Sequence, residues 1–366
     1  MNPLVELHAY GQSFWYDNIR RAYLNDGTIR RLIDDDGLRG MTSNPSIFEK
    51  AIGMGDEYDQ QIKQASSEGM DVIATYEALA LTDIQAACDL FSDVYSSSNR
   101  KDGFVSLEVS PHLSHDQEGT IAEARRLYSS VSRPNVMIKV PATPAGIPAI
   151  EQLIAEGINI NVTLMFSMAH YESVSNAYIN GLTRWVDGGG NPSHVSSVAS
   201  FFISRVDTAV DKALSDSGDP TTDLLMGKTA VANSKIVYQR FKELFHGDRF
   251  AELRSAGAEV QRLLWASTST KNPRYPDTIY VDELIGPETV NTMPPQTIEA
   301  FRDHGRLANT LEQGLDQSFR LIEQIAQLDI NLDQITEQLQ ENGVQAFADS
   351  YDNLLSTLRS KIAILV

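Results

Sequence analysis

The stretch V136-M-I-K-V-P-A-T-P-A-G146 decides the fold, because it places a lysine inside an apolar run that predicts a buried strand. The turn-forming residues P-A-T-P-A-G follow at once, so Lys139 lies near the C-terminal end of that strand. Side chains alternate between the two faces of a strand. If Val136, Ile138 and Val140 pack under helices, Met137 and Lys139 therefore point to the opposite side.

The position of Lys139 is compatible with two interpretations. Burial disfavours the charged ammonium, and a neutral amine can attack a carbonyl carbon. Alternatively, the stem of the side chain packs among apolar residues while its tip reaches water. The strand alone leaves both open.

The rest of the chain alternates short strand-like runs with longer helical patterns. The predicted strands are 13–17, 38–44, 103–110, 135–141, 158–166, 195–202, 262–267 and 277–284. Eight strands alternating with helices predict a parallel sheet, and eight is the number that closes a (β/α)8 TIM barrel of the α/β class. Polar and apolar residues alternate in several strands, which is also typical of an antiparallel sheet with one solvated face. The long helical spacers favour the barrel.

Three segments carry apolar residues at the i, i+3/i+4 spacing of an amphipathic helix. They are 72–91, 307–322 and 347–362. The sequence contains no internal repeat, low-complexity tract or linker, so we expect a single domain over residues 1–366. Within it we expect a barrel core at approximately 10–290 and appended C-terminal helices over 295–366.

The composition limits the classes of function. The net charge of −19 argues against nonspecific binding to nucleic acid or to an acidic membrane. It is compatible with a phosphorylated substrate, which needs only one or two local cations. No apolar run approaches the length of a membrane span, and the first residues show no secretory pattern, so we expect a cytoplasmic protein. The single cysteine, Cys88, lies on the apolar face of a predicted helix and is expected to be a small buried side chain.

Polar residues end several of the predicted strands. Asp17 ends the first, Asn44 the second, Glu108 the third, and Asn161 with Thr163 the fifth. In a barrel these side chains would gather at the end where Lys139 lies. A lysine that forms a carbinolamine needs groups that transfer protons, and carboxylates near a water can supply them. Two carboxylates and two amides at matching strand ends therefore predict an active site.

Four stretches, in order along the chain, resemble the signatures of the transaldolase family. They are G40-M-T-S-N-P-S-I-F48, S106-L-E-V-S-P-H-L-S-H-D116, V136-M-I-K-V-P141 and G157-I-N-I-N-V-T-L-M-F166. The first alone could be an ordinary strand-to-helix turn with Pro at the first helical position. Four in order, within a resemblance that covers roughly residues 13 to 290, form a specific pattern.

The resemblance implies a class I Schiff-base mechanism on a (β/α)8 barrel, with no metal and no cofactor. Lys139 matches the imine-forming lysine, and Asp17 matches the acid/base that takes the proton of the C4 hydroxyl as the C3–C4 bond breaks. Glu108 matches the residue that works through a bound water during carbinolamine formation and dehydration, with Thr163 holding that water. The groups that match binders of substrate hydroxyls and of the dihydroxyacetone unit are Asn44, Asn161 and Ser200.

The resemblance also implies a phosphate site. Arg205 matches a phosphate-binding arginine, although an ion pair with Asp207 or Asp211 is the alternative that the residues themselves suggest. Many family members carry a second arginine in an A-S-x-R pattern. Here Ser267 matches the serine, no arginine follows, and Lys271 is the nearest cation, which can bind phosphate as a point charge.

The implied activity is transfer of a dihydroxyacetone unit between sugar phosphates in the non-oxidative pentose phosphate pathway. Sedoheptulose 7-phosphate and glyceraldehyde 3-phosphate would give erythrose 4-phosphate and fructose 6-phosphate. A Schiff-base aldolase that releases free dihydroxyacetone is the enzymatic alternative, and a catalytically silent binding barrel is the other. A metal site at His112, His115 and Asp116 with Glu108 is a third alternative. The sequence does not indicate an oligomeric state.

Overall fold

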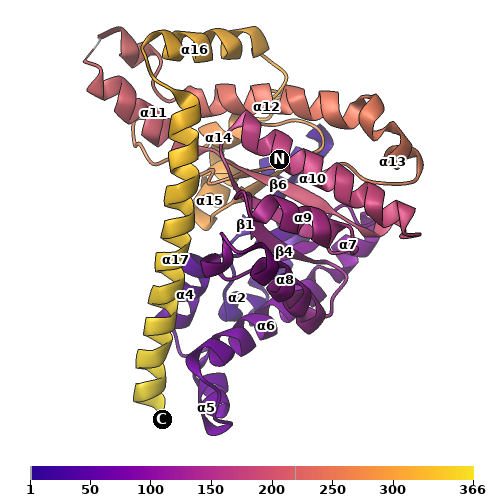
Figure 1. The fold of residues 1–366 in the computed structure, drawn as a ribbon. Coiled ribbons are helices and arrows are strands. Elements are labelled where there is room, and N and C mark those ends of the chain that lie inside the picture. Colours follow the sequence, from indigo (N-terminus) through magenta and orange to yellow (C-terminus); the bar gives the residue numbers. More distant parts are fainter. Residues whose placement is uncertain (1, 219) are drawn as a thin grey trace.

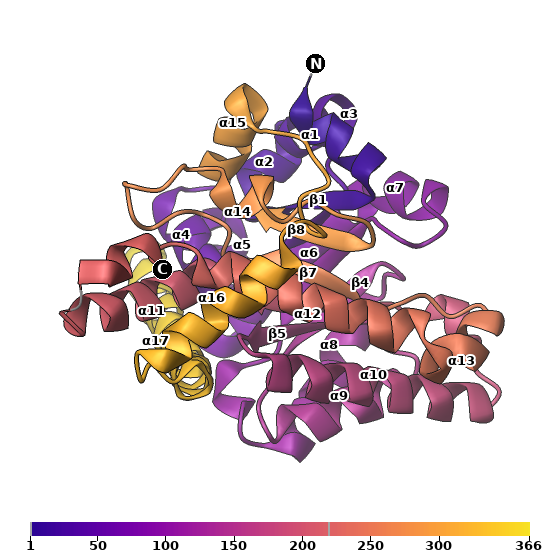
Figure 2. The same cartoon turned by 90° about the horizontal axis from the view of Figure 1, so that it is seen from above.

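The computed structural model describes residues 2–218 and 220–366, and its centre is a closed barrel of eight parallel strands (Figures 1 and 2). Each strand pairs with its neighbours in the chain, and the last pairs with the first. The predicted (β/α)8 barrel is therefore confirmed. The strands are β1 Gln12–Asp17, β2 Gly40–Thr42, β3 Phe104–Glu108, β4 Val136–Pro141, β5 Ile160–Met165, β6 Ser197–Phe202, β7 Arg262–Ala266 and β8 Thr289–Met293.

All the predicted strands except the last coincide with a strand of the barrel, and the last prediction is wrong. Residues 277–284 instead contain α14 (Ile279–Asp282), a helical turn that Thr278 closes by donating its hydroxyl to Asp282 Oδ2 (2.8 Å). In the true eighth strand, TVNTM, apolar and polar residues do not alternate. Its polar side chains are buried and bonded internally, as where Thr289 donates to the Gly286 carbonyl (2.6 Å).

Helices surround the barrel and connect consecutive strands (Figure 2). The β1–β2 connection contains two of them, which explains the long spacing between Asp17 and Asn44. The helices around the barrel are α1 Pro3–Glu6, α2 Arg21–Asn25, α3 Thr28–Asp36, α4 Pro45–Met54, α5 Asp59–Ser67, α6 Val72–Leu90, α7 Ser92–Ser97, α8 Gln117–Val131, α9 Gly146–Ile154, α10 Met168–Asp187, α11 Ser204–Asp216, α12 Thr229–His246, α13 Ala251–Ser255 and α15 Pro295–His304.

The predicted helix over 72–91 is confirmed as α6, but the one over 307–322 is confirmed only in its second half. Helix α16 spans Leu315–Gln327 and begins after Gly314, whose φ of 70° is left-handed. Leu311 lies in the preceding connection, where it is buried and its N–H donates to the Ile285 carbonyl (3.0 Å). Its apolar side chain is therefore buried without being part of a helix face.

The last helix, α17 (Leu332–Leu365), runs along one side of the molecule from α11 towards α5 (Figure 1). It confirms the helical pattern predicted over 347–362, because Phe347, Tyr351, Leu354 and Leu358 are all buried on one face. Its main contact is with α4, beside the C-terminal end of β2. We propose that α16 and α17 are appended to the barrel and form one domain with it.

Candidate active site

The residues at the centre of the site lie side by side on neighbouring strands. The strand register pairs Glu108 on β3 with Lys139 on β4, and Lys139 with Asn161 on β5. Residues paired in this way point to the same side of a sheet, here into the barrel. Lys139 is 5% exposed, and its Nζ donates to the carbonyl oxygen of Ser43 (3.2 Å). The amine therefore stays inside the barrel and does not extend to the outer surface.

Glu108 lies beside this amine in a poorly solvated position. Its Oε2 is 3.7 Å from Lys139 Nζ, and both side chains are 6% exposed. Burial raises the pKa of the Glu108 carboxyl to about 7, although the neighbouring lysine acts in the opposite direction. A carboxyl group with this pKa can both donate and accept a proton near neutral pH.

Two buried oxygens near the lysine have no hydrogen-bond partner among the described residues. They are Glu108 Oε2 on β3 and Thr163 Oγ1 on β5, on the two strands that flank β4. Unsatisfied buried polar atoms are uncommon in folded proteins and often mark an ordered water or a catalytic group. Both atoms are thus available to hold a water molecule close to Lys139.

The second carboxylate is provided by Asp17 at the end of β1. Its Oδ1 accepts a hydrogen bond from the hydroxyl of Thr42 on β2 (2.7 Å), and that hydroxyl is 2.7 Å from Thr292 Oγ1 on β8. Burial raises the pKa of the Asp17 carboxyl, and Lys139 partly offsets this effect. Thr42 thus holds one carboxylate oxygen and Thr292 holds Thr42, so residues of three strands fix the orientation of the group.

The predicted amide and hydroxyl groups occupy two parts of the site. Asn44 caps α4, where its Oδ1 accepts from the N–H of Ile47 (3.0 Å). Deeper in the barrel, Asn161 Nδ2 donates to Ser106 Oγ (2.9 Å), and Ser200 Oγ donates to Asn161 Oδ1 (2.6 Å). These bonds fix the orientation of the Asn161 amide beside the lysine.

A cavity of about 490 Å³ opens at the C-terminal ends of the strands. Its wall contains most of the predicted site residues and some that the sequence analysis missed, including Lys50 of α4 and Phe347 of α17. Glu108, Asn161 and Thr163 are not part of this wall and adjoin the cavity through Lys139 and Ser200. The predicted residues that line it are Asp17, Asn44, Lys139, Ser200, Arg205, Ser267 and Lys271.

Arg205 lies in this cavity without an ion-pair partner in the described part of the chain. Its guanidinium stacks on Phe202 (5.1 Å to the ring centre) and on Phe347 (5.9 Å). The alternative of an ion pair with Asp207 or Asp211 is wrong. Asp207 accepts from the N–H of Ala230 and the hydroxyl of Tyr280, and Asp211 accepts from Gly227 and Tyr275.

Lys271 lies at the exposed rim of the same cavity. Its Nζ donates to Ser269 Oγ (2.6 Å), and the pKa of its ammonium is lowered by partial burial and by the positive charge of Arg205. Ser267 has a left-handed φ of 58°, which directs the chain between β7 and this rim, and its hydroxyl is 3.0 Å from that of Ser204. Arg205, Lys271 and Lys50 therefore face the cavity without an ion-pair partner among the described residues.

Comparison with known proteins places the chain in a family. A model of the family described as Transaldolase/Fructose-6-phosphate aldolase matches residues 14–358. The chain belongs to the transaldolase family. It is 45% identical to Transaldolase 2 from Nostoc sp., covering 100% of this chain and 99% of the relative. It is 45% identical to a transaldolase from Thiobacillus denitrificans (98% and 100% covered) and 44% identical to one from Mycolicibacterium smegmatis (99% and 98%).

The metal site considered from the sequence is not assembled in this transaldolase-family barrel. His112 Nε2 is 2.9 Å from Asp352 Oδ1 on α17, and Asp116 caps α8, while Glu108 points into the barrel. The described residues contain no group of three His, Cys, Asp or Glu side chains suited to a metal ion. Cys88 is buried in α6, as predicted, and burial raises the pKa of its thiol.

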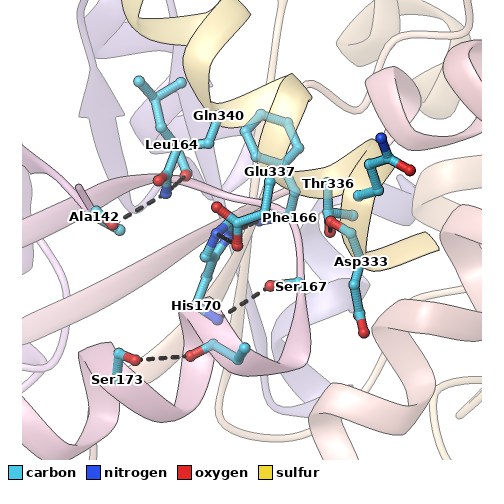
Figure 3. Close-up of polar contacts among 12 residues, drawn as sticks. Ala142, Leu164, Phe166, Ser167, His170, Ser173, Asp333, Thr336, Glu337 and Gln340 are labelled. Atoms are coloured by element: carbon cyan, nitrogen blue, oxygen red, sulfur yellow. Dashed lines mark hydrogen bonds and ion pairs between the residues drawn. The ribbon is translucent and has the colours of Figure 1, made fainter. Parts of the chain in front are cut away.

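One amide connects helix α17 to the ends of two barrel strands. Gln340 Nε2 donates to the carbonyl oxygens of Ala142 (3.0 Å) and Leu164 (2.9 Å), at the ends of β4 and β5 (Figure 3). Leu164 has a left-handed φ of 61° at a register shift of β5, directly after Thr163. Two turns farther along α17, Phe347 lies 5.8 Å from Lys139 Nζ. The amide thus connects the helix to the strands that hold the site.

Substitution of Gln340→Met tests this connection. It leaves two buried carbonyl groups without a donor, so we expect the free energy of unfolding to fall by about 1–3 kcal/mol. We also expect KM for a sugar phosphate to rise, because Phe347 loses its fixed position in the cavity wall. Chemical denaturation and steady-state kinetics measure the two effects. Gln345→Met, on the exposed side of the same helix, is the matched control, and an equal loss there would refute the role of Gln340.

Proposed function

We propose that this chain transfers a dihydroxyacetone unit between sugar phosphates through a Schiff base on Lys139. The overall reaction converts sedoheptulose 7-phosphate and glyceraldehyde 3-phosphate to erythrose 4-phosphate and fructose 6-phosphate. The observation that carries the proposal is the register of the barrel, which places a buried amine beside a buried carboxyl, and that amine lines a cavity that also contains Arg205 and Lys271. The membership of the chain in the transaldolase family supports the same activity.

Formation of the Schiff base requires several proton transfers, and Lys139 and Glu108 can carry them out together. The unprotonated amine attacks C2 of the ketose and forms a carbinolamine, and the nitrogen loses a proton as the oxygen gains one. The C2–O bond then breaks, and the proton held by Glu108 leaves with the hydroxyl as water. A water held between the free oxygens of Glu108 and Thr163 would transfer these protons over the intervening distance.

Cleavage of the sugar is assigned to Asp17. As the C3–C4 bond breaks, the C4 hydroxyl becomes an aldehyde and its proton passes to the Asp17 carboxylate. The electron pair of the bond moves towards the iminium nitrogen of Lys139, which gives an enamine. When an acceptor aldehyde arrives, the enamine carbon attacks it and Asp17 returns the proton to the new hydroxyl. Asn44, Asn161 and Ser200 would hold the hydroxyls of the three-carbon unit throughout.

The phosphate of either sugar is assigned to Arg205 and Lys271. The guanidinium fork can donate paired, charge-assisted hydrogen bonds, and the ammonium adds a point charge. Ser267, which also lines the cavity, would contribute its hydroxyl. Neither cation has a carboxylate partner in the described structure, so a phosphate dianion would supply the missing counter-charge.

Measurement of the products tests the proposed function against the aldolase alternative. With fructose 6-phosphate and erythrose 4-phosphate together, we expect formation of sedoheptulose 7-phosphate and glyceraldehyde 3-phosphate. With fructose 6-phosphate alone, we expect release of free dihydroxyacetone to be slow, because Glu108 and the enclosed cavity protect the enamine until an acceptor arrives. Release of free dihydroxyacetone at a rate equal to transfer would overturn the proposal in favour of an aldolase.

The compartment and the cofactor requirement of the reaction are part of the same proposal. No helix in the described residues is both long enough and apolar enough to span a bilayer. We propose that the enzyme works in the cytoplasm on small sugar phosphates, without a metal or an organic cofactor, since the lysine itself supplies the electron sink.

A further inference from the structure

Ion pairing divides the arginines of this protein into two groups. Half-buried arginines need a partner, because a guanidinium removed from water without a counter-charge is unfavourable. Arg39, Arg100 and Arg205 are the half-buried arginines that make no ion pair with a carboxylate among the described residues. The half-buried arginines that do are Arg20, Arg21, Arg133, Arg240, Arg262 and Arg302.

Arg205 lies in the proposed phosphate site, and the other two unpaired arginines share a different cavity. Arg39 and Arg100 both line a space of about 580 Å³ at the N-terminal ends of the strands. Ser13 of β1, Phe104 of β3 and Arg262 of β7, which begin or nearly begin their strands, line the same space. This cavity is therefore at the opposite end of the barrel from Lys139.

Each acidic residue of this second cavity already has a partner. Asp102 pairs with Arg262 (2.9 Å), Glu259 with Lys101 (3.3 Å), and Glu288 with His246 (2.7 Å). Arg39 and Arg100 remain without such a partner, and the Nε of Arg39 is buried with no hydrogen-bond acceptor in the described structure. Four cationic and three carboxylate side chains thus line the cavity, an excess of one positive charge in a protein whose net charge is −19.

The backbone holds these two arginines in place. Arg39 immediately precedes β2, and its carbonyl accepts a hydrogen bond from the N–H of Gly103 (2.6 Å). That bond fixes the loop containing Arg100, whose φ of 67° is left-handed, as is the φ of 53° at Asn99. Such a conformation is unfavourable for arginine and is maintained only when its surroundings require it.

We propose that this cavity binds a small phosphate-bearing anion, at a site separate from the catalytic one. The guanidinium groups of Arg39 and Arg100 would each donate hydrogen bonds to the phosphate oxygens and gain a counter-charge. The volume lies within the range of small-molecule sites and accommodates a phosphorylated metabolite as well as inorganic phosphate.

Calorimetric titration with inorganic phosphate tests the site without interference from catalysis. The titrated protein is the full chain carrying Arg205→Gln and Lys271→Gln, which weaken the catalytic phosphate site. We expect it to retain one binding event, and we expect Arg39→Gln with Arg100→Gln to weaken that event about tenfold or more. Arg30→Gln with Arg359→Gln, two exposed arginines, changes the net charge equally and is expected to leave the affinity within about twofold.

Further measurements separate this proposal from the proposed function. In the otherwise unchanged enzyme, Arg39→Gln with Arg100→Gln should retain the folded circular dichroism spectrum and transaldolase turnover at saturating substrate. Arg39→Lys with Arg100→Lys should recover part of the phosphate affinity, because lysine restores the positive charge but not the paired hydrogen bonds of a guanidinium. Absence of binding in the starting variant, or binding that survives loss of both arginines, would overturn the second site and leave the Lys139 chemistry untouched.

Discussion

Substitution of Lys139→Met is expected to reduce kcat for dihydroxyacetone transfer by about 10⁴-fold or more, since it removes the amine that forms the proposed covalent intermediate. Borohydride reduction in the presence of fructose 6-phosphate should add a three-carbon unit to the parent protein and nothing to this variant. Mass spectrometry of the intact chain and of its peptides measures the adduct and its position. Methionine has a similar volume and no amine, so the buried position should remain filled.

Lys235 provides a matched control for this experiment. It is also a buried lysine, 8% exposed, but its Nζ pairs with Glu283 Oε2 (3.3 Å) outside the catalytic cavity. Lys235→Met should keep both the adduct and the activity once its folded fraction is measured. An adduct that persists in Lys139→Met, or activity equal to the parent, would exclude the proposed mechanism.

The second large effect is expected for Glu108→Gln, which keeps the shape of the side chain and removes its titratable proton. The rate of Schiff-base formation should fall by about 10²–10⁴-fold, the usual range for loss of a general acid/base. Trapping with borohydride at short times measures this rate. Glu123→Gln is the control, because burial also raises the pKa of Glu123 and its carboxylate accepts from Ser110 N–H (2.7 Å) rather than facing Lys139. An equal loss in both variants would indicate a structural effect.

The raised pKa of Glu108 also predicts how this rate depends on pH. In the proposed mechanism Glu108 delivers a proton with the leaving hydroxyl, and it must first accept that proton as a carboxylate. As the pH falls below about 7, the Glu108 carboxylate is already protonated before the reaction begins, so the rate of Schiff-base formation should fall. The rate should therefore rise with pH around a midpoint near 7 in the parent. The same midpoint in Glu108→Gln would show that another group is responsible.

The strand pattern and the position of Lys139 made the barrel and the centre of its site predictable. Period-two alternation around Lys139 and Glu108 places both side chains inside, and the register then brings them together. The eighth strand was not predictable in this way. Its polar side chains bond to other parts of the chain, as where Gln12 Nε2 donates to Thr289 Oγ1 (3.0 Å), and these polar positions interrupt the apolar alternation of a strand.

Residues contributed by helices were also missed, for a different physical reason. Lys50 and Phe347 have ordinary helical surroundings in the sequence, and only the packing of α17 against α4 brings both to the cavity. Gln340 is one of several glutamines in α17 and is distinguished only by the two carbonyl groups it meets, 198 and 176 residues away in the chain. No local sequence pattern predicts contacts between residues so far apart in the chain.

The wall that α17 contributes has a consequence for protein synthesis. Translation produces all eight strands before Phe347, so a nascent chain can close its barrel while this helix is still within the ribosome. Such a chain would already contain the amine of Lys139 but would leave it accessible to any cellular aldehyde. Docking of α17 would then convert an indiscriminate nucleophile into a selective one, late in the maturation of the enzyme.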